Sequence, residues 1–112
     1  MEISEFVRRQ QEFDSRRGVE TRWSAAISEQ DTSALMHNSL ALAGEVGELA
    51  NLVKKYDRGD FPFAHLLDLL PGELADIAIY VVKLAYQSGI DLEAALLAKL
   101  SENENRFPRI RE

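Results

Sequence analysis

The sequence predicts an all-α fold, a bundle of four to five helices, and two observations lead to this prediction. Apolar residues recur at helical spacing in several stretches, and no segment alternates between apolar and polar residues as a half-buried strand does. Pro, Gly and Asp residues separate these stretches at the places where helices usually begin and end. With 112 residues, the chain has the length of one domain, which we expect to span residues 1–112.

The first two predicted helices are separated by a long stretch without a pattern. Apolar spacing predicts an amphipathic helix over about residues 2–13. Residues 14–32 show no sustained period, so we expect a loop with short helical pieces. The second helix is predicted from about Ser33 to Tyr56, before the turn-like residues 57–60.

Turn residues divide the second half of the chain. Residues 61–70 predict a short helix that starts near a proline, and Pro71-Gly72 is expected to end it before a third helix begins. Gly89 is suited to cap the third helix at its C-terminus. Asp91 is suited to be the N-cap of a fourth helix that reaches about Phe107.

Two acidic pairs with the same spacing lie in stretches that otherwise hold few charges. Residues three apart on a helix point to the same side, so antiparallel packing of the second and third helices would let the four carboxylates converge. Carboxylates rarely enter apolar surroundings unless they are paired or bind a metal, which predicts a metal site. The alternative is a set of solvated surface carboxylates. The pairs are Glu45 with Glu48, and Glu73 with Asp76.

The fourth helix holds a second candidate group. Lys99, Asn103 and Arg106 follow one another at helical spacing on one side. The two cations are natural phosphate partners, and an asparagine side chain both donates and accepts hydrogen bonds. The alternative is that the cations complement the dipole at the helix C-terminus, which needs no ligand.

Composition excludes several classes of function. A net charge of −6 without a basic stripe argues against a binder of nucleic-acid polymers. The absence of cysteine excludes disulfides, thiolate zinc sites and cysteine nucleophiles. No apolar run is long enough to span a membrane, and the charged N-terminus does not resemble a signal peptide. We therefore expect a cytoplasmic protein without a membrane partner.

Two strings in the chain resemble a known family. LALAGEVGELANLVKKY and ELADIAIYVVKLAYQSGIDLEAALLAKLSENENRFP are similar to the MazG-type, all-α nucleoside triphosphate pyrophosphohydrolases, including their dCTP pyrophosphatase branch. The family's ExxE, spacer, ExxD signature matches both acidic pairs. Its lysine, asparagine and arginine near the chain end match the group on the fourth helix, followed here by Phe107-Pro108. The resemblance covers about residues 36–108.

The resemblance implies an enzyme that hydrolyses nucleoside triphosphates, with deoxynucleotides favoured, to the monophosphate and pyrophosphate. It implies Mg²⁺ as cofactor, with Mn²⁺ able to substitute. Lys99 and Arg106 would stabilise charge on the phosphates, and Asn103 would orient phosphate or sugar. All four acids would be metal ligands with a catalytic role: Glu45, Glu48, Glu73 and Asp76.

Base recognition has weaker signals. Tyr80 lies one turn beyond Asp76, where the dCTP pyrophosphatase branch has an aromatic residue, and could stack on a base or contact the sugar. A buried core tyrosine is the alternative. Trp23 could cover a base pocket or serve as a hydrophobic anchor. His37 and His65 lack metal-ligand spacing, so we expect them to be structural or exposed.

The second helix predicts a homo-oligomer, a tetramer or dimer. It is apolar or small on nearly every side, and a small-residue face of Ala43, Gly47 and Ala50 would let another backbone approach. Two alternative functions stay open. One is a phosphoribosyl-ATP pyrophosphohydrolase, which shares the helical fold and the acidic pattern. The other is a non-catalytic oligomerisation or regulatory module with a vestigial metal site.

Overall fold

The computed structural model of the chain describes residues 1–17, 25–107 and 109–110. Within these ranges the only pairing of β type is one isolated bridge between Ser28 and Asp31, so the all-α prediction is confirmed for the described residues. Their α-helices are α1 (Ile3–Arg17), α2 (Ser33–Asp57), α3 (Phe63–Gln87) and α4 (Leu92–Arg106).

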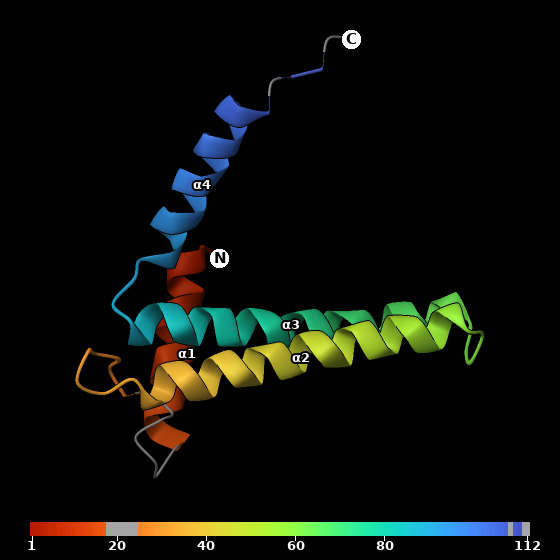
Figure 1. Cartoon of the computed structure of the whole chain (residues 1–112), viewed down its shortest axis with the longest axis horizontal. Coiled ribbons are helices and arrows are strands. Elements are labelled where there is room, and N and C mark those ends of the chain that lie inside the picture. The colour runs from red at the N-terminus through yellow and green to blue at the C-terminus, as the bar shows by residue number, and fades with distance from the viewer. Residues whose placement is uncertain (18–24, 108, 111–112) are drawn as a thin grey trace.

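Helices α2 and α3 form a long antiparallel hairpin (Figure 1). Its turn contains Gly59, whose φ of +91° is a conformation that residues with a side chain rarely adopt. Aromatic rings pack at this end of the hairpin, with ring centroids 5.6 Å apart for Tyr56 and Phe63. The ring centroids of His65 and Phe61 are 5.0 Å apart, so this histidine has a structural role, one of the two roles expected for it.

Helix α1 crosses one end of the hairpin, and α4 extends away from it (Figure 1). Helix α4 packs against α1 and α3, and Ser4 Oγ donates a hydrogen bond of 2.9 Å to Glu93 Oε2. The predicted caps between α3 and α4 are present. Gly89 has a φ of +71°, and the Asp91 side chain accepts a hydrogen bond of 3.0 Å from the backbone N–H of Ala94.

Helix α1 is longer than predicted, because it continues to Arg17 instead of ending near residue 13. Glu12 forms ion pairs one turn away in both directions, at 3.8 Å with Arg8 and 3.0 Å with Arg16. Asp14 turns inward and is 1% exposed. These ion pairs and the buried carboxylate stabilise the last turn of α1. Because all of these residues are polar, a prediction based on the spacing of apolar residues missed this turn.

The predicted break at Pro71-Gly72 is wrong, since α3 runs through both residues without interruption. Leu66, Leu70 and Ile77 recur at helical spacing across the proline and face inward, so one packing stripe joins the two predicted pieces. A proline inside a helix removes one backbone hydrogen bond. Packing of the whole stripe against α2 outweighs that loss. The prediction of a fifth, separate short helix fails for the same reason.

The chain has a thin core and a large exposed apolar surface. Its radius of gyration is 17.3 Å, compared with about 13 Å for a compact domain of about 100 residues. Val46 and Val53, on one apolar stripe of α2, are 47% and 44% exposed, and Leu74 on α3 is 53% exposed. The burial expected for α2 is therefore not achieved within one chain. None of the helices in the described ranges has the length and apolarity needed to cross a bilayer.

Candidate functional site

The antiparallel hairpin brings the two acidic pairs to one place. Glu45 from α2 and Glu73 and Asp76 from α3 each contribute a carboxylate oxygen, and these three oxygens lie within 4.8 Å of one another. Glu48 is one turn along α2, and its charge is close enough to act on Glu45. We call these four residues the acid cluster.

Two oxygens of the acid cluster lie in an unfavourable environment. Glu45 Oε2 and Glu73 Oε2 are buried and accept no hydrogen bond from the described residues. Burial, and then the negative charges of Glu48, Asp76 and Glu73, raise the pKa of Glu45. A buried acceptor without a donor is costly, and a divalent cation would remove that cost. Carboxylate oxygens are also the ligands that Mg²⁺ prefers, so these residues fit that ion.

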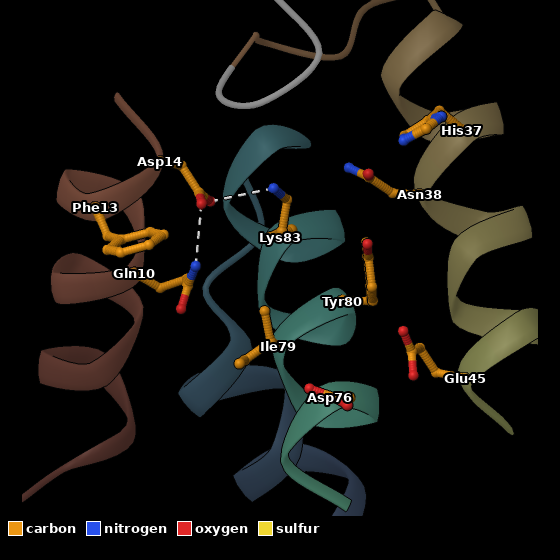
Figure 2. Close-up of a pocket in the computed structure, with 10 residues that line it drawn as sticks. All are labelled: Gln10, Phe13, Asp14, His37, Asn38, Glu45, Asp76, Ile79, Tyr80 and Lys83. Atoms are coloured by element: carbon orange, nitrogen blue, oxygen red, sulfur yellow. Dashed lines mark hydrogen bonds and ion pairs between the residues drawn. The ribbon is translucent and has the colours of Figure 1, made fainter. Parts of the chain in front are cut away.

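A cavity of about 660 Å³ extends from the acid cluster toward α1. Such a volume is within the range of about 300–1,000 Å³ that is usual for small-molecule sites. Figure 2 shows Tyr80 between the acidic end of the cavity and a second polar end near α1. The lining residues are Gln10, Phe13 and Asp14 from α1, His37, Asn38 and Glu45 from α2, and Asp76, Ile79, Tyr80 and Lys83 from α3.

The second polar end is a buried ion pair that the sequence did not lead us to expect. Lys83 Nζ lies 3.4 Å from Asp14 Oδ2, and the two residues are 7% and 1% exposed. Gln10 Nε2 donates to Asp14 Oδ1 at 3.0 Å, and the Tyr86 hydroxyl donates to Asp14 Oδ2. Burial and Asp14 raise the pKa of Tyr86, which keeps its phenol protonated. The sequence held one sign of this ion pair, because Lys83 is the single cation in the largely apolar stretch of residues 73–86.

A hydrogen-bond chain of amides fixes the α2 wall of the cavity. Asn38 Nδ2 donates to Gln87 Oε1 at 2.6 Å, and Gln87 Nε2 donates to the backbone oxygen of Ala25 at 2.9 Å. The backbone N–H of Ile27 donates to the backbone carbonyl oxygen of Gln87 at 2.7 Å. Asn38 is 1% exposed, whereas the neighbouring His37 is exposed at the cavity wall. The segment before α2 is thereby attached to the end of α3.

The three residues of α4 that we predicted to bind phosphate do not lie near the acid cluster within one chain. Lys99, Asn103 and Arg106 lie on the helix that extends away from the hairpin in Figure 1, and none of them lines the cavity. Lys99 Nζ is 3.4 Å from Glu102 Oε1, and the Arg106 guanidinium lies over the Phe107 ring at 5.1 Å. The other base-pocket candidate, Trp23, lies outside the described residues.

Residues 30–110 match the family model of the MazG nucleotide pyrophosphohydrolase domain. The chain belongs to this family. The matched range contains the complete acid cluster and the three candidate residues of α4, so the resemblance seen in the sequence is confirmed. No solved structure matches the chain.

Curated relatives of this MazG-domain chain include proteins named dCTP pyrophosphatase 1. The protein from Bos taurus is 45% identical over 73 residues, and those from Homo sapiens and Mus musculus are each 42% identical over 73 residues. Each alignment covers 62% of this chain and 43% of the relative. The chain therefore matches less than half of the length of these relatives.

Proposed function

We propose that this MazG-domain chain hydrolyses nucleoside triphosphates, preferentially deoxynucleotides, to the monophosphate and pyrophosphate. The observation that carries the proposal is the meeting of three carboxylate oxygens within 4.8 Å at one end of a cavity of nucleotide size. Membership of the MazG nucleotide pyrophosphohydrolase domain family and the likeness to proteins named dCTP pyrophosphatase 1 support it.

The acid cluster would hold Mg²⁺, with Mn²⁺ able to substitute. A cation held there would supply positive charge to offset that of the phosphates and would lower the pKa of the attacking water. Water adds to phosphorus, the bond between the α- and β-phosphates breaks, and pyrophosphate leaves. One glutamate of the cluster accepts the proton of the water. Glu45, Glu48, Glu73 and Asp76 are the proposed ligands.

Tyr80 is the proposed contact for the nucleoside. It lies one helical turn from Asp76 on the same side of α3 and lines the cavity beside the acid cluster (Figure 2). A ring at this place offers a flat apolar surface to a sugar or a base. This position next to the acids favours a substrate role over a purely structural one. Trp23 remains a proposed contact for the base.

The working form of the protein is proposed to be a homodimer or homotetramer. A second copy would cover the exposed apolar stripe of α2. The small face of Ala43, Gly47 and Ala50 would allow close packing, since apart from the adjacent helix backbone no described residue lies within 4 Å of a Cβ added at Gly47. Neighbouring copies would also give α4 access to an acid cluster. Lys99, Asn103 and Arg106 would then contact the phosphates across the interface.

A nucleotide panel tests the activity. The chain is incubated with Mg²⁺ or Mn²⁺ and each common nucleoside triphosphate, and the products are separated. We expect a nucleoside monophosphate and pyrophosphate in equal amounts, with deoxynucleotides turned over faster than ribonucleotides. Release of orthophosphate would refute the reaction. Turnover of phosphoribosyl-ATP alone, or of no compound despite metal binding, would replace the proposal by one of the two alternative functions.

A further inference from the structure

The buried ion pair between Asp14 and Lys83 shares a cavity with the acid cluster without being part of it. Asp76, Tyr80 and Lys83 follow one another along one face of α3. Seven residues of α-helix separate Asp76 from Lys83, which is roughly 10 Å along the helix axis. A nucleoside whose phosphates are held at the acidic end would therefore extend past Tyr80 and place its base near the ion pair (Figure 2).

Stability gives no reason to prefer this ion pair over apolar side chains of similar volume. Both residues are almost completely buried, and replacing such a pair by apolar side chains is often neutral or stabilising. Gln10 and Tyr86 also donate hydrogen bonds to Asp14, so side chains from two helices fix this ion pair at the cavity wall. A set of polar groups fixed in this way is typical of a site that orients a ligand.

The charges indicate what kind of group the ion pair can bind. Asp14 cancels the charge of Lys83, so this end of the cavity does not attract a phosphate as an unpaired cation would. It presents ammonium N–H donors beside carboxylate acceptors, next to the apolar side chains of Phe13 and Ile79. A neutral, flat molecule with donors and acceptors along one edge fits these properties, and a nucleobase is such a molecule.

We propose that the Asp14–Lys83 ion pair selects the base of the substrate by hydrogen bonding to the polar edge of that base. The inference rests on the proposed function, because it takes the phosphates to lie at the acid cluster. Hydrogen bonds to charged groups in low-dielectric surroundings discriminate strongly, since a mismatched base leaves a buried polar group without its partner. Lys83 and Asp14 are thus specificity-determining residues, and neither acts on the reacting phosphorus.

The test is calorimetric binding of dCMP, dTMP, dAMP and dGMP to the full chain, which needs no hydrolysis. We expect the wild-type affinities for the preferred and the poorest base to differ by roughly tenfold or more. In the double variant Asp14→Asn/Lys83→Met, which removes both charges together, this spread should shrink to within about threefold. The control is Arg58→Ala/Asp60→Ala, which removes an exposed ion pair outside the cavity and should keep the wild-type spread.

Equal binding of all four monophosphates by the wild type, or an unchanged spread in a folded double variant, would overturn the inference. If the double variant does not fold, Lys83→Arg keeps the charge but moves the donors, and an unchanged ranking of the bases would also overturn it. Base-selective binding without pyrophosphate release would refute the proposed function alone. Pyrophosphate release with an unaltered base preference in the variants would refute the ion-pair inference alone.

Discussion

At the scale of single residues, the acid cluster combines groups that destabilise the metal-free fold. Glu45 and Glu73 each have a buried oxygen that accepts no hydrogen bond from the described residues, and the other acids add repulsion. A bound cation would reverse this balance and stabilise the native state by mass action. The cluster should therefore behave differently from solvated carboxylates, which have no such dependence on metal.

Neutralising one acid of the cluster should separate activity from stability. We expect Glu48→Gln and Asp76→Asn each to abolish hydrolysis nearly completely, while the metal-free variants melt no lower than the wild type. Each should also reduce the upward shift in melting temperature that Mg²⁺ causes. The exposed Asp68 lies on α3 outside the cluster, so Asp68→Asn should change none of these properties. Full activity in both cluster variants would show that the acids are ordinary surface groups.

The raised pKa of Glu45 predicts how stability depends on pH without metal. The folded state holds a proton on Glu45 above the ordinary pKa of 4.5, where the unfolded chain releases it. The contribution of Glu45 to stability is then greatest at low pH, and it is lost as pH rises from 4.5 through the raised pKa. Urea unfolding in EDTA across this range should show the decline in the wild type, and Glu45→Gln should show less of it. Parallel curves for the two proteins would contradict this prediction.

The acid cluster could be predicted from the sequence because its signal is local. The three-residue spacing fixes each pair on one side of a helix, and the isolation of Glu45 and Glu48 among apolar residues marks them as unusual. The ion pair of Asp14 and Lys83 could not be predicted in this way. Its partners are far apart in the sequence, and only the crossing of α1 and α3 brings them together.

At the scale of helices, α3 shows where local signals mislead. A proline followed by glycine usually ends a helix, but here the inward-facing stripe on both sides of Pro71 packs against the same partner helix. The helix limits at Gly89 and Asp91 were predictable, because a cap depends on residues next to each other in the chain. The continuity of α3 depends on packing with a helix that precedes it in the sequence.

Replacing the proline inside α3 should stabilise the protein. Pro71→Ala restores a backbone N–H within a continuous helix, and alanine is better than proline in a helix interior by about 3 kcal/mol. The greater freedom of the unfolded chain offsets about 1 kcal/mol of this gain. We expect the free energy of unfolding, measured with urea, to rise by about 2 kcal/mol. Pro62→Ala, at the N-cap of the same helix, should have a smaller effect, and equal effects would argue against a proline cost inside α3.

Helix α4 should contribute to catalysis although it lies away from the hairpin. We expect Lys99→Ala and Arg106→Ala to lower kcat/KM by roughly 30- to 1,000-fold, the effect of losing a charge-assisted contact of about 2–4 kcal/mol in the transition state. Melting temperatures should change little, because both side chains are exposed. Arg8→Ala on α1 removes a cation of similar exposure as a control. Unchanged kinetics in both variants would mean that these cations only complement the dipole at the C-terminus of α4.

At the scale of the whole molecule, the exposed apolar surface leads us to predict that one chain is not the stable unit. The radius of gyration is 17.3 Å, and large apolar side chains of α2, α3 and α4 are exposed together. We expect light scattering to give the mass of a dimer or tetramer, and the melting temperature to rise with protein concentration because folding is linked to association. A monomer at micromolar concentration with a concentration-independent melting temperature would contradict this expectation.

Gly47 distinguishes an exposed helix face from an interface. Both glycines are inside helices, and apart from the adjacent helix backbone no described residue lies within 4 Å of a Cβ added at Gly47 or at Gly72. For an isolated chain, Gly→Ala at either position should stabilise the fold by up to about 1 kcal/mol. If a second copy packs its backbone against Ala43, Gly47 and Ala50, Gly47→Ala should instead weaken association, while Gly72→Ala should still stabilise. Sedimentation measures association and urea unfolding measures stability, and equal stabilisation by both substitutions would place the small face of α2 in solvent.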